Sequence, residues 1–280
     1  MLIGLSLVFA LFNVSAQHLV FGQINLLLGF LCLWGMTRSW APRWLPRGAL
    51  IGVAAGIKLT PALFVVFFLV AGRWREAVAS IGAFLATVAI GAVLLPRSTS
   101  EYFLGQLTGL SSVVDLGENF ATSGNSSLQG VAQRWLGTHD LLVLAPLLLI
   151  VVIAPFVAAH RAQRRDEPAL AVAVIGVAMC LLSPVSWLHH WVWVFPAVVL
   201  LWGRGRAGTA LAILWSLACL AQLTDLGDMA GRSDTVPLVL VELMRSSMVL
   251  LGLAFLAVAL LPPLRERSRD SVSRVTVGAE

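Results

Sequence analysis

The sequence predicts an all-α membrane protein, a polytopic bundle of about 7–8 transmembrane helices with one re-entrant hairpin. Hydrophobic residues make up 59% of the chain and charged residues only 12%, whereas about a quarter of an ordinary soluble domain is charged. Apolar runs long enough to cross a bilayer, about 18 residues or more, recur along the chain. Because backbone groups inside a bilayer must bond within their own segment, we expect these runs to be helices.

The candidate membrane segments belong to one domain, residues 1–263, which a short tail follows. The first apolar run, 1–15, is shorter than one crossing requires and has no basic flank. We therefore expect it to be the end of a first helix that begins upstream. The other candidate segments are 17–36, 48–72, 76–95, 140–159, 168–186, 187–203, 208–224 and 238–262.

The placement of the arginines predicts the orientation of the bundle. Only Arg97, Arg134 and Arg232 fall in one set of connections, while the alternate set is rich in arginine. By the positive-inside rule, the arginine-rich set is cytoplasmic. We therefore expect a multi-pass plasma-membrane protein whose loop at 97–139, with a short interfacial helix, lies outside and whose basic tail at 264–280 lies inside. The cytoplasmic set comprises Arg38, Arg43, Arg47, Arg73, Arg75, Arg161, Arg164, Arg165, Arg204, Arg206, Arg265, Arg267, Arg269 and Arg274.

Residues 48–72 carry basic residues on both flanks, so both ends of this segment are expected on the cytoplasmic face. The segment is too short to cross twice, since one crossing takes about 20 residues. A re-entrant helical hairpin with Gly56–Pro61 at its tip meets both conditions. A single span with one basic loop on the wrong side is the alternative. The flanking residues are Arg43, Arg47, Arg73 and Arg75.

Lys58 lies at the centre of that apolar segment. A lysine at such a depth costs about 2.5–3.5 kcal/mol on insertion scales and is usually retained to face a cavity or a counter-charge. The plainer interpretation is that the aliphatic part of the lysine side chain extends along the segment and places the ammonium at the membrane–water interface. The middle of a long apolar run is a poor place to do so, and we favour a role in binding an anionic group.

A second polar group lies in the stretch Ser183–Trp193, which contains three tryptophans and the pair His189-His190. Tryptophan favours the membrane–water boundary, and histidine titrates near neutral pH. An interfacial aromatic belt with incidental histidines is the plainer interpretation. A site for chemistry at the outer face is the alternative.

The remaining polar candidates are weaker when taken singly. Gln23 and Asn25 have amides that suit sugar hydroxyls or a neighbouring helix, and Arg134 has a planar fork of donors that suits a phosphate. The three cysteines lie in apolar runs without metal-ligand spacing, so we expect neither a disulfide nor a metal site. The net charge of +5 is not taken as a sign of nucleic-acid binding.

Four stretches, taken in chain order, carry a family resemblance. They are Phe21–Leu27; Gly56–Pro61 followed by Gly72–Arg75; Gly124-Asn125 with Ser127-Leu128 and Arg134; and Leu182–Trp187 with His189–Trp191. Together they resemble glycosyltransferase family 87, the actinobacterial polyprenol-phosphate-mannose-dependent α-(1→2)-mannosyltransferases. The resemblance runs from about residue 15 to 260 and implies a membrane fold of the GT-C type.

The resemblance implies transfer of mannose from a polyprenyl-phosphate donor to a glycolipid acceptor at the outer face, in envelope lipoglycan or phosphatidylinositol mannoside synthesis, without metal or cofactor. His190 and His189 would position or polarise a reactant, and Lys58 and Arg134 would neutralise the phosphate. The residues expected to bind sugar hydroxyls or line the site are Gln23, Asn25, Asn125, Ser183 and Trp187.

In GT-C enzymes the catalytic base is an acid in the first outer loop, and no such loop precedes the partial helix at 1–15. We expect a shortened gene model rather than a remnant without its base. Three other readings stay open: an arabinofuranosyltransferase of the same family, a lipid or solute transporter, and a non-catalytic membrane partner. A transporter predicts paired repeats in the two halves, which the sequence does not show.

Overall fold

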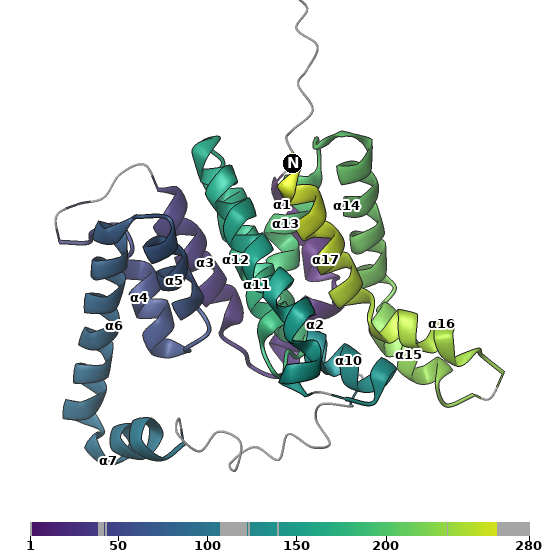
Figure 1. Ribbon diagram of the computed structural model, residues 1–280, viewed down its shortest axis with the longest axis horizontal. Coiled ribbons are helices and arrows are strands. Elements are labelled where there is room, and N and C mark those ends of the chain that lie inside the picture. The colour runs from purple at the N-terminus through teal and green to yellow at the C-terminus, as the bar shows by residue number, and fades with distance from the viewer. Residues whose placement is uncertain are drawn as a thin grey trace, which may run out of the picture.

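The computed structural model describes residues 2–38, 42, 44–106, 122, 124–138, 140–233 and 235–261. Over these ranges the chain is helical and contains no strand (Figure 1). The helices are α1 (Leu2–Ala10), α2 (Asn13–Val20), α3 (Asn25–Thr37), α4 (Ala49–Ile57), α5 (Ala62–Val70), α6 (Trp74–Leu94), α7 (Pro96–Ser100), η1 (Glu101–Gln106), α10 (Leu128–Leu136), α11 (Leu141–Arg164), α12 (Pro168–Leu182), η2 (Leu188–Trp193), α13 (Val194–Leu201), α14 (Gly205–Leu220), α15 (Leu223–Ala230), α16 (Leu238–Arg245) and α17 (Ser247–Leu260).

The prediction of an all-α fold is confirmed, and the apolar helices fit a membrane protein. Within the described ranges, two helices, α6 and α11, are long and apolar enough to cross a membrane unaided, or up to five if each bent pair counts as one span. The predicted number of about 7–8 spans therefore stays a prediction. The basic tail at 264–280 lies outside the described residues, as does most of the loop between α7 and α10.

Three predicted segments are not single straight helices. The segment 17–36 is divided between α2 and α3, which meet at 117°. Gly22 ends α2 in the left-handed region, at φ 57°, and the Gln23 amide donates back to the His18 carbonyl, as in a Schellman cap. The segments 208–224 and 238–262 likewise bend, by 56° and 61°. Apolar run length alone located these segments but did not reveal their breaks.

The predicted helical hairpin is present. Gly48, directly before α4, and Gly52 and Gly56 within it follow one another at four-residue spacing. They contact Glu76, Ser80 and Thr87 of α6 respectively. Since both series ascend together, α4 and α6 run parallel. The helix that joins them, α5, must therefore run back in the opposite direction. Both ends of the hairpin thus lie at one end of the bundle, and its placement in a membrane stays a prediction.

The tip of the hairpin lies deep along α6. Thr87, which contacts the end of α4, lies about 20 Å along α6 from Trp74 at 1.5 Å per residue. The whole helix has 21 residues and is about 31 Å long. Lys58, directly after α4, therefore lies roughly two thirds of the way along α6.

Close packing of α4 on α6 requires Gly52 to remain a glycine. A Cβ there would collide with the Ser80 carbonyl oxygen and the Ala83 side chain. Gly52→Ala should therefore destabilise the protein by about 1–3 kcal/mol, as overpacking typically does, and lower its thermal unfolding midpoint. Gly82→Ala, on the open face of α6 where nothing lies within 4 Å, is the matched control and should leave the midpoint unchanged or raise it. Equal midpoints for the two variants would contradict this account.

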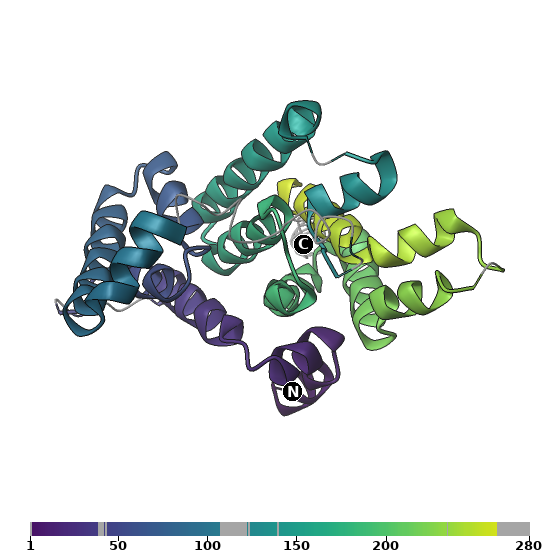
Figure 2. The same cartoon turned by 90° about the horizontal axis from the view of Figure 1, so that it is seen from below.

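The helix α12 joins the two halves of the bundle. All residues from Leu170 to Leu181 are buried, as expected for a helix that is apolar on every side. It contacts α3 and α5 on one side and α11, α13 and α17 on the other. Figure 2 shows the α3–α6 group and the α14–α17 group standing apart, with α11–α13 between them. The position of α12 brings η2, which follows it, against α2 and α3.

Candidate functional site

The ammonium group of Lys58 joins three segments that are distant in the sequence. Lys58 Nζ lies 3.0 Å from Asn25 Oδ1 and 3.1 Å from His190 Nε2. Asn25 in turn donates from Nδ2 to the His189 carbonyl at 3.0 Å. No carboxylate forms an ion pair with Lys58 in the part of the chain that the structure describes. The site therefore holds a positive charge whose partners are all neutral.

Local sequence places each member of this cluster at a helix end. The helix α4 ends where Lys58 becomes extended, at φ −146° and ψ 130°, and Pro61 then begins the return through α5. Asn25 is the first residue of α3. The two histidines lie in η2, a short 3-10 turn between α12 and α13. Irregular backbone of this kind is tolerated at membrane depth only where protein covers it or a cavity lies beside it.

Lys58 borders two hollows. The smaller, of about 40 Å³, includes Asn25 and His190 in its wall. The larger, of about 330 Å³, is a mostly apolar groove along α6, α7 and η1. Further residues of the small cavity are Thr60, Cys180, Ser183 and Ser186, and the polar residues of the groove are Thr87, Ser98, Thr99 and Tyr102. A charged group at the junction of a polar cavity and an apolar groove suits a ligand with an anionic head and a hydrocarbon chain.

His189 is arranged differently from its neighbour. Its ring packs edge-on against His190, at 4.6 Å between centroids, and near Phe21, while its Nδ1 is buried without a partner among the described atoms. Only its backbone carbonyl joins the cluster, through Asn25. His190 therefore reaches Lys58 through its side chain, whereas the main chain of His189 reaches Asn25.

The other predicted lining residues are only partly brought together. Ser183 borders the small cavity, although its hydroxyl donates to the Val185 carbonyl at 2.7 Å. Gln23 lies half-buried in the turn between α2 and α3. Trp187 packs its ring against Gly124, where a Cβ would lie within 2.9 Å of it. Neither Gln23 nor Trp187 borders the Lys58 cavity.

Asn125 is fully buried and holds the chain that leads to the histidines. Its Nδ2 donates to the Pro184 carbonyl at 3.2 Å, and its Oδ1 accepts from the Ser186 amide at 3.1 Å. The next two residues add bonds to the same stretch, from the Ser126 amide to the Ser186 carbonyl and from the Ser127 hydroxyl to the Pro184 carbonyl. In this structure the Asn125 amide positions residues 184–186.

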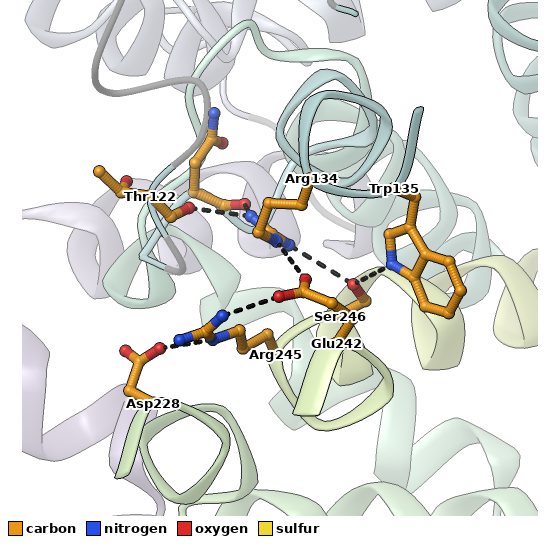
Figure 3. Close-up of polar contacts among 8 residues, drawn as sticks. Thr122, Arg134, Trp135, Asp228, Glu242, Arg245 and Ser246 are labelled. Atoms are coloured by element: carbon orange, nitrogen blue, oxygen red, sulfur yellow. Dashed lines mark hydrogen bonds and ion pairs between the residues drawn. The ribbon is translucent and has the colours of Figure 1, made fainter. Parts of the chain in front are cut away.

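Arg134 also makes internal bonds. Its guanidinium donates to the Thr122 and Asn125 carbonyls at 2.8 and 3.0 Å and pairs with Glu242 at 3.2 Å. Figure 3 shows how this pair continues through Arg245 to Asp228, joining α10, α16 and α15. Burial lowers the pKa of Arg134, and the Glu242 carboxylate opposes that shift. The structure does not bring Arg134 to the Lys58 cluster; its phosphate-binding role stays a prediction.

One residue near the cluster is missing from the predicted set. His18 is buried, and its Nε2 accepts from the Leu26 amide at 3.1 Å, which satisfies one of the free donors at the start of α3. It thereby fixes the helix end on which Asn25 lies. The sequence signal that could have identified His18 is a histidine at the beginning of an apolar run. Its partner, the Leu26 amide, could not be predicted, because the break at Gly22 brings the two together.

Comparison with known proteins agrees with the resemblance. A model of glycosyltransferase family 87 matches residues 1–184. The chain belongs to this family. The match ends just before Ser186–His190, so the histidine pair lies beyond the part that the family model covers. No solved structure matches the chain significantly.

Curated relatives come from mycobacteria. A polyprenol-phosphate-mannose-dependent alpha-(1-2)-phosphatidylinositol pentamannoside mannosyltransferase of Mycobacterium tuberculosis is 38% identical over 183 residues, or 64% of this chain and 40% of the relative. A phosphatidylinositol mannoside mannosyltransferase of the same species is 33% identical over 202 residues, 71% of this chain and 46% of the relative. A Mycolicibacterium smegmatis pentamannoside mannosyltransferase is 36% identical, over 64% and 42%. The chain thus spans less than half the length of these relatives.

Proposed function

We propose that this chain is part of a membrane mannosyltransferase and that Lys58 binds the phosphate of its polyprenyl-phosphate-mannose donor. The observation that carries the proposal is the Lys58 ammonium, held at 3.0 and 3.1 Å by Asn25 and His190 without a carboxylate partner in the described structure. A half-buried cation whose partners are all neutral keeps its attraction for an anion, because no carboxylate neutralises it. Family membership and the names of the relatives support a phosphate-bearing donor.

Sugar transfer would use this arrangement as follows. The acceptor hydroxyl oxygen bonds to the anomeric carbon, the bond from that carbon to the phosphate oxygen breaks, and the phosphate leaves with the electron pair. The hydroxyl proton passes to a general base. Because charge on the phosphate increases as this bond breaks, Lys58 stabilises the transition state more than the bound donor. His190 and Asn25 hold the ammonium in place, each accepting a hydrogen bond from it.

The surroundings of Lys58 suit the rest of such a donor. The apolar groove along α6 suits the polyprenyl chain, and the small polar cavity lined by Asn25, Ser183 and His190 offers polar contacts beside Lys58 to the phosphate end of the donor. The relatives' names support a phosphatidylinositol mannoside as the acceptor class. The arginine distribution supports a site facing outside.

Donor binding tests the role of Lys58 without requiring complete turnover. The protein in detergent micelles should bind polyprenyl monophosphate at least about tenfold more tightly than the uncharged polyprenol, since bonds to charged groups are worth about 1.5–3 kcal/mol. Lys58→Ala should remove that preference while binding the polyprenol unchanged. Gln222→Ala, an exposed position, is the control. A preference that survives in Lys58→Ala would refute the assignment.

A further inference from the structure

A second polar pocket lies at the opposite end of the bundle from Lys58. It is open, has a volume of about 640 Å³ and lies where three chain reversals meet: the end of α3, the α5–α6 corner and the α11–α12 corner. Three arginines and two acids border it. Its polar and charged residues are Thr37, Arg38, Arg47, Arg73, Glu76, Gln163 and Asp166.

Arg38 is the unusual member of this set. The residue is only 8% exposed, and its Nη2 donates to the Leu45 and Pro46 carbonyls, both at 2.7 Å. Its Nε and Nη1 are buried without a partner among the described residues. A buried donor left unpaired costs about 1–3 kcal/mol, and more when it is charged. Two nitrogens of the charged Arg38 guanidinium, Nε and Nη1, therefore have no hydrogen-bond acceptor among the described residues of the folded protein.

The acids of the pocket do not compensate for Arg38. Glu76 is paired with Arg73 at 2.8 Å, and Arg73 also donates to Gln163 at 2.6 Å. Asp166 forms no ion pair with Arg38 over the described ranges. Burial, and then the neighbouring charge of Arg47, lower the pKa of Arg38, the direction expected when no anion stabilises the guanidinium.

We propose that this pocket binds a phosphate group, carried by an anionic phospholipid headgroup or by free inorganic phosphate, through Arg38 and Arg47. A phosphate offers several acceptor oxygens to the fork of a guanidinium. Basic pockets between transmembrane helices on the cytoplasmic side suit lipid headgroups in particular. The site is distinct from the Lys58 cluster, and bound lipid there would tie α3 to the α4–α5 hairpin through the loop that Arg38 holds.

Binding of phosphatidylglycerol tests the proposal. A fluorescent phosphatidylglycerol titrated into micelles of the purified protein should bind saturably and more tightly than the matching phosphatidylcholine, and Arg38→Gln should weaken it about tenfold. Arg47→Gln, at an exposed lining position, should weaken it less without threatening the fold. Arg75→Gln, exposed and next to the pocket but not bordering it, should leave binding unchanged.

Inorganic phosphate forms the second arm, which identifies the source of the group. Competition by millimolar phosphate would indicate a free-phosphate site, and insensitivity to it would indicate a headgroup site. Wild-type affinity for both probes in Arg38→Gln and Arg47→Gln would overturn the proposal. If Arg38→Gln does not fold, as judged by size-exclusion chromatography, the Arg47→Gln titration decides alone.

Discussion

Replacing Lys58 with alanine is expected to lower mannose transfer about 10²–10³-fold, the range observed when one preorganised donor to a developing anion is removed. The ammonium is the positive group that the structure places between the small cavity and the apolar groove. Without it, the phosphate would leave into a site whose nearest groups, Asn25 and His190, are neutral. The measurement is transfer from polyprenyl-phosphate-mannose by membranes containing the full protein, normalised to its amount.

Two further variants sharpen this experiment. Lys58→Arg keeps the positive charge, but a guanidinium is broader than an ammonium. Because the site holds a compact ammonium between Asn25 and His190, this variant should restore activity only partly. Gln222→Ala should retain full activity. Near-normal transfer by Lys58→Ala would refute the role, whereas a loss of folded protein equal to the loss of transfer would give Lys58 a structural role instead.

The second large effect is expected at His190 and not at His189. His190 Nε2 holds Lys58 at 3.1 Å, and a misplacement of about 1 Å at a reacting centre can cost about 10² in rate. His190→Ala should therefore lower transfer about 10²-fold. His190→Gln, which keeps an acceptor at a similar reach, should recover part of it.

His189→Ala is the matched comparison. Its link to the cluster is the backbone carbonyl that accepts from Asn25, which alanine preserves, so the expected loss is less than about tenfold. Transfer rates are measured in the same membranes. The preference of each variant for polyprenyl monophosphate over polyprenol is measured alongside. Equal losses for the two histidine variants would contradict the assignment, because they would show that the pair acts through packing and not through the His190 ring.

The sequence alone predicted the class of protein and the segment that we propose binds the donor phosphate. Long apolar runs and uneven arginines are local signals, so they predicted the helical membrane fold and the hairpin at 48–72 without knowledge of any contact. Lys58 was identifiable because a charge inside an apolar run is costly wherever that run is placed.

Tertiary structure alone decided how the polar residues are used. Whether an amide binds substrate or another part of the chain depends on which segments become neighbours, and hydrogen bonds over long sequence separations are not encoded in spacing. Asn25 meets Lys58 across 33 residues, while Asn125 and Arg134, which looked equally suitable, bond to Pro184 and Glu242. The break at Gly22 decides where α3 begins, and so places Asn25 within reach of both Lys58 and His189, because a helix start fixes the direction of its first side chain.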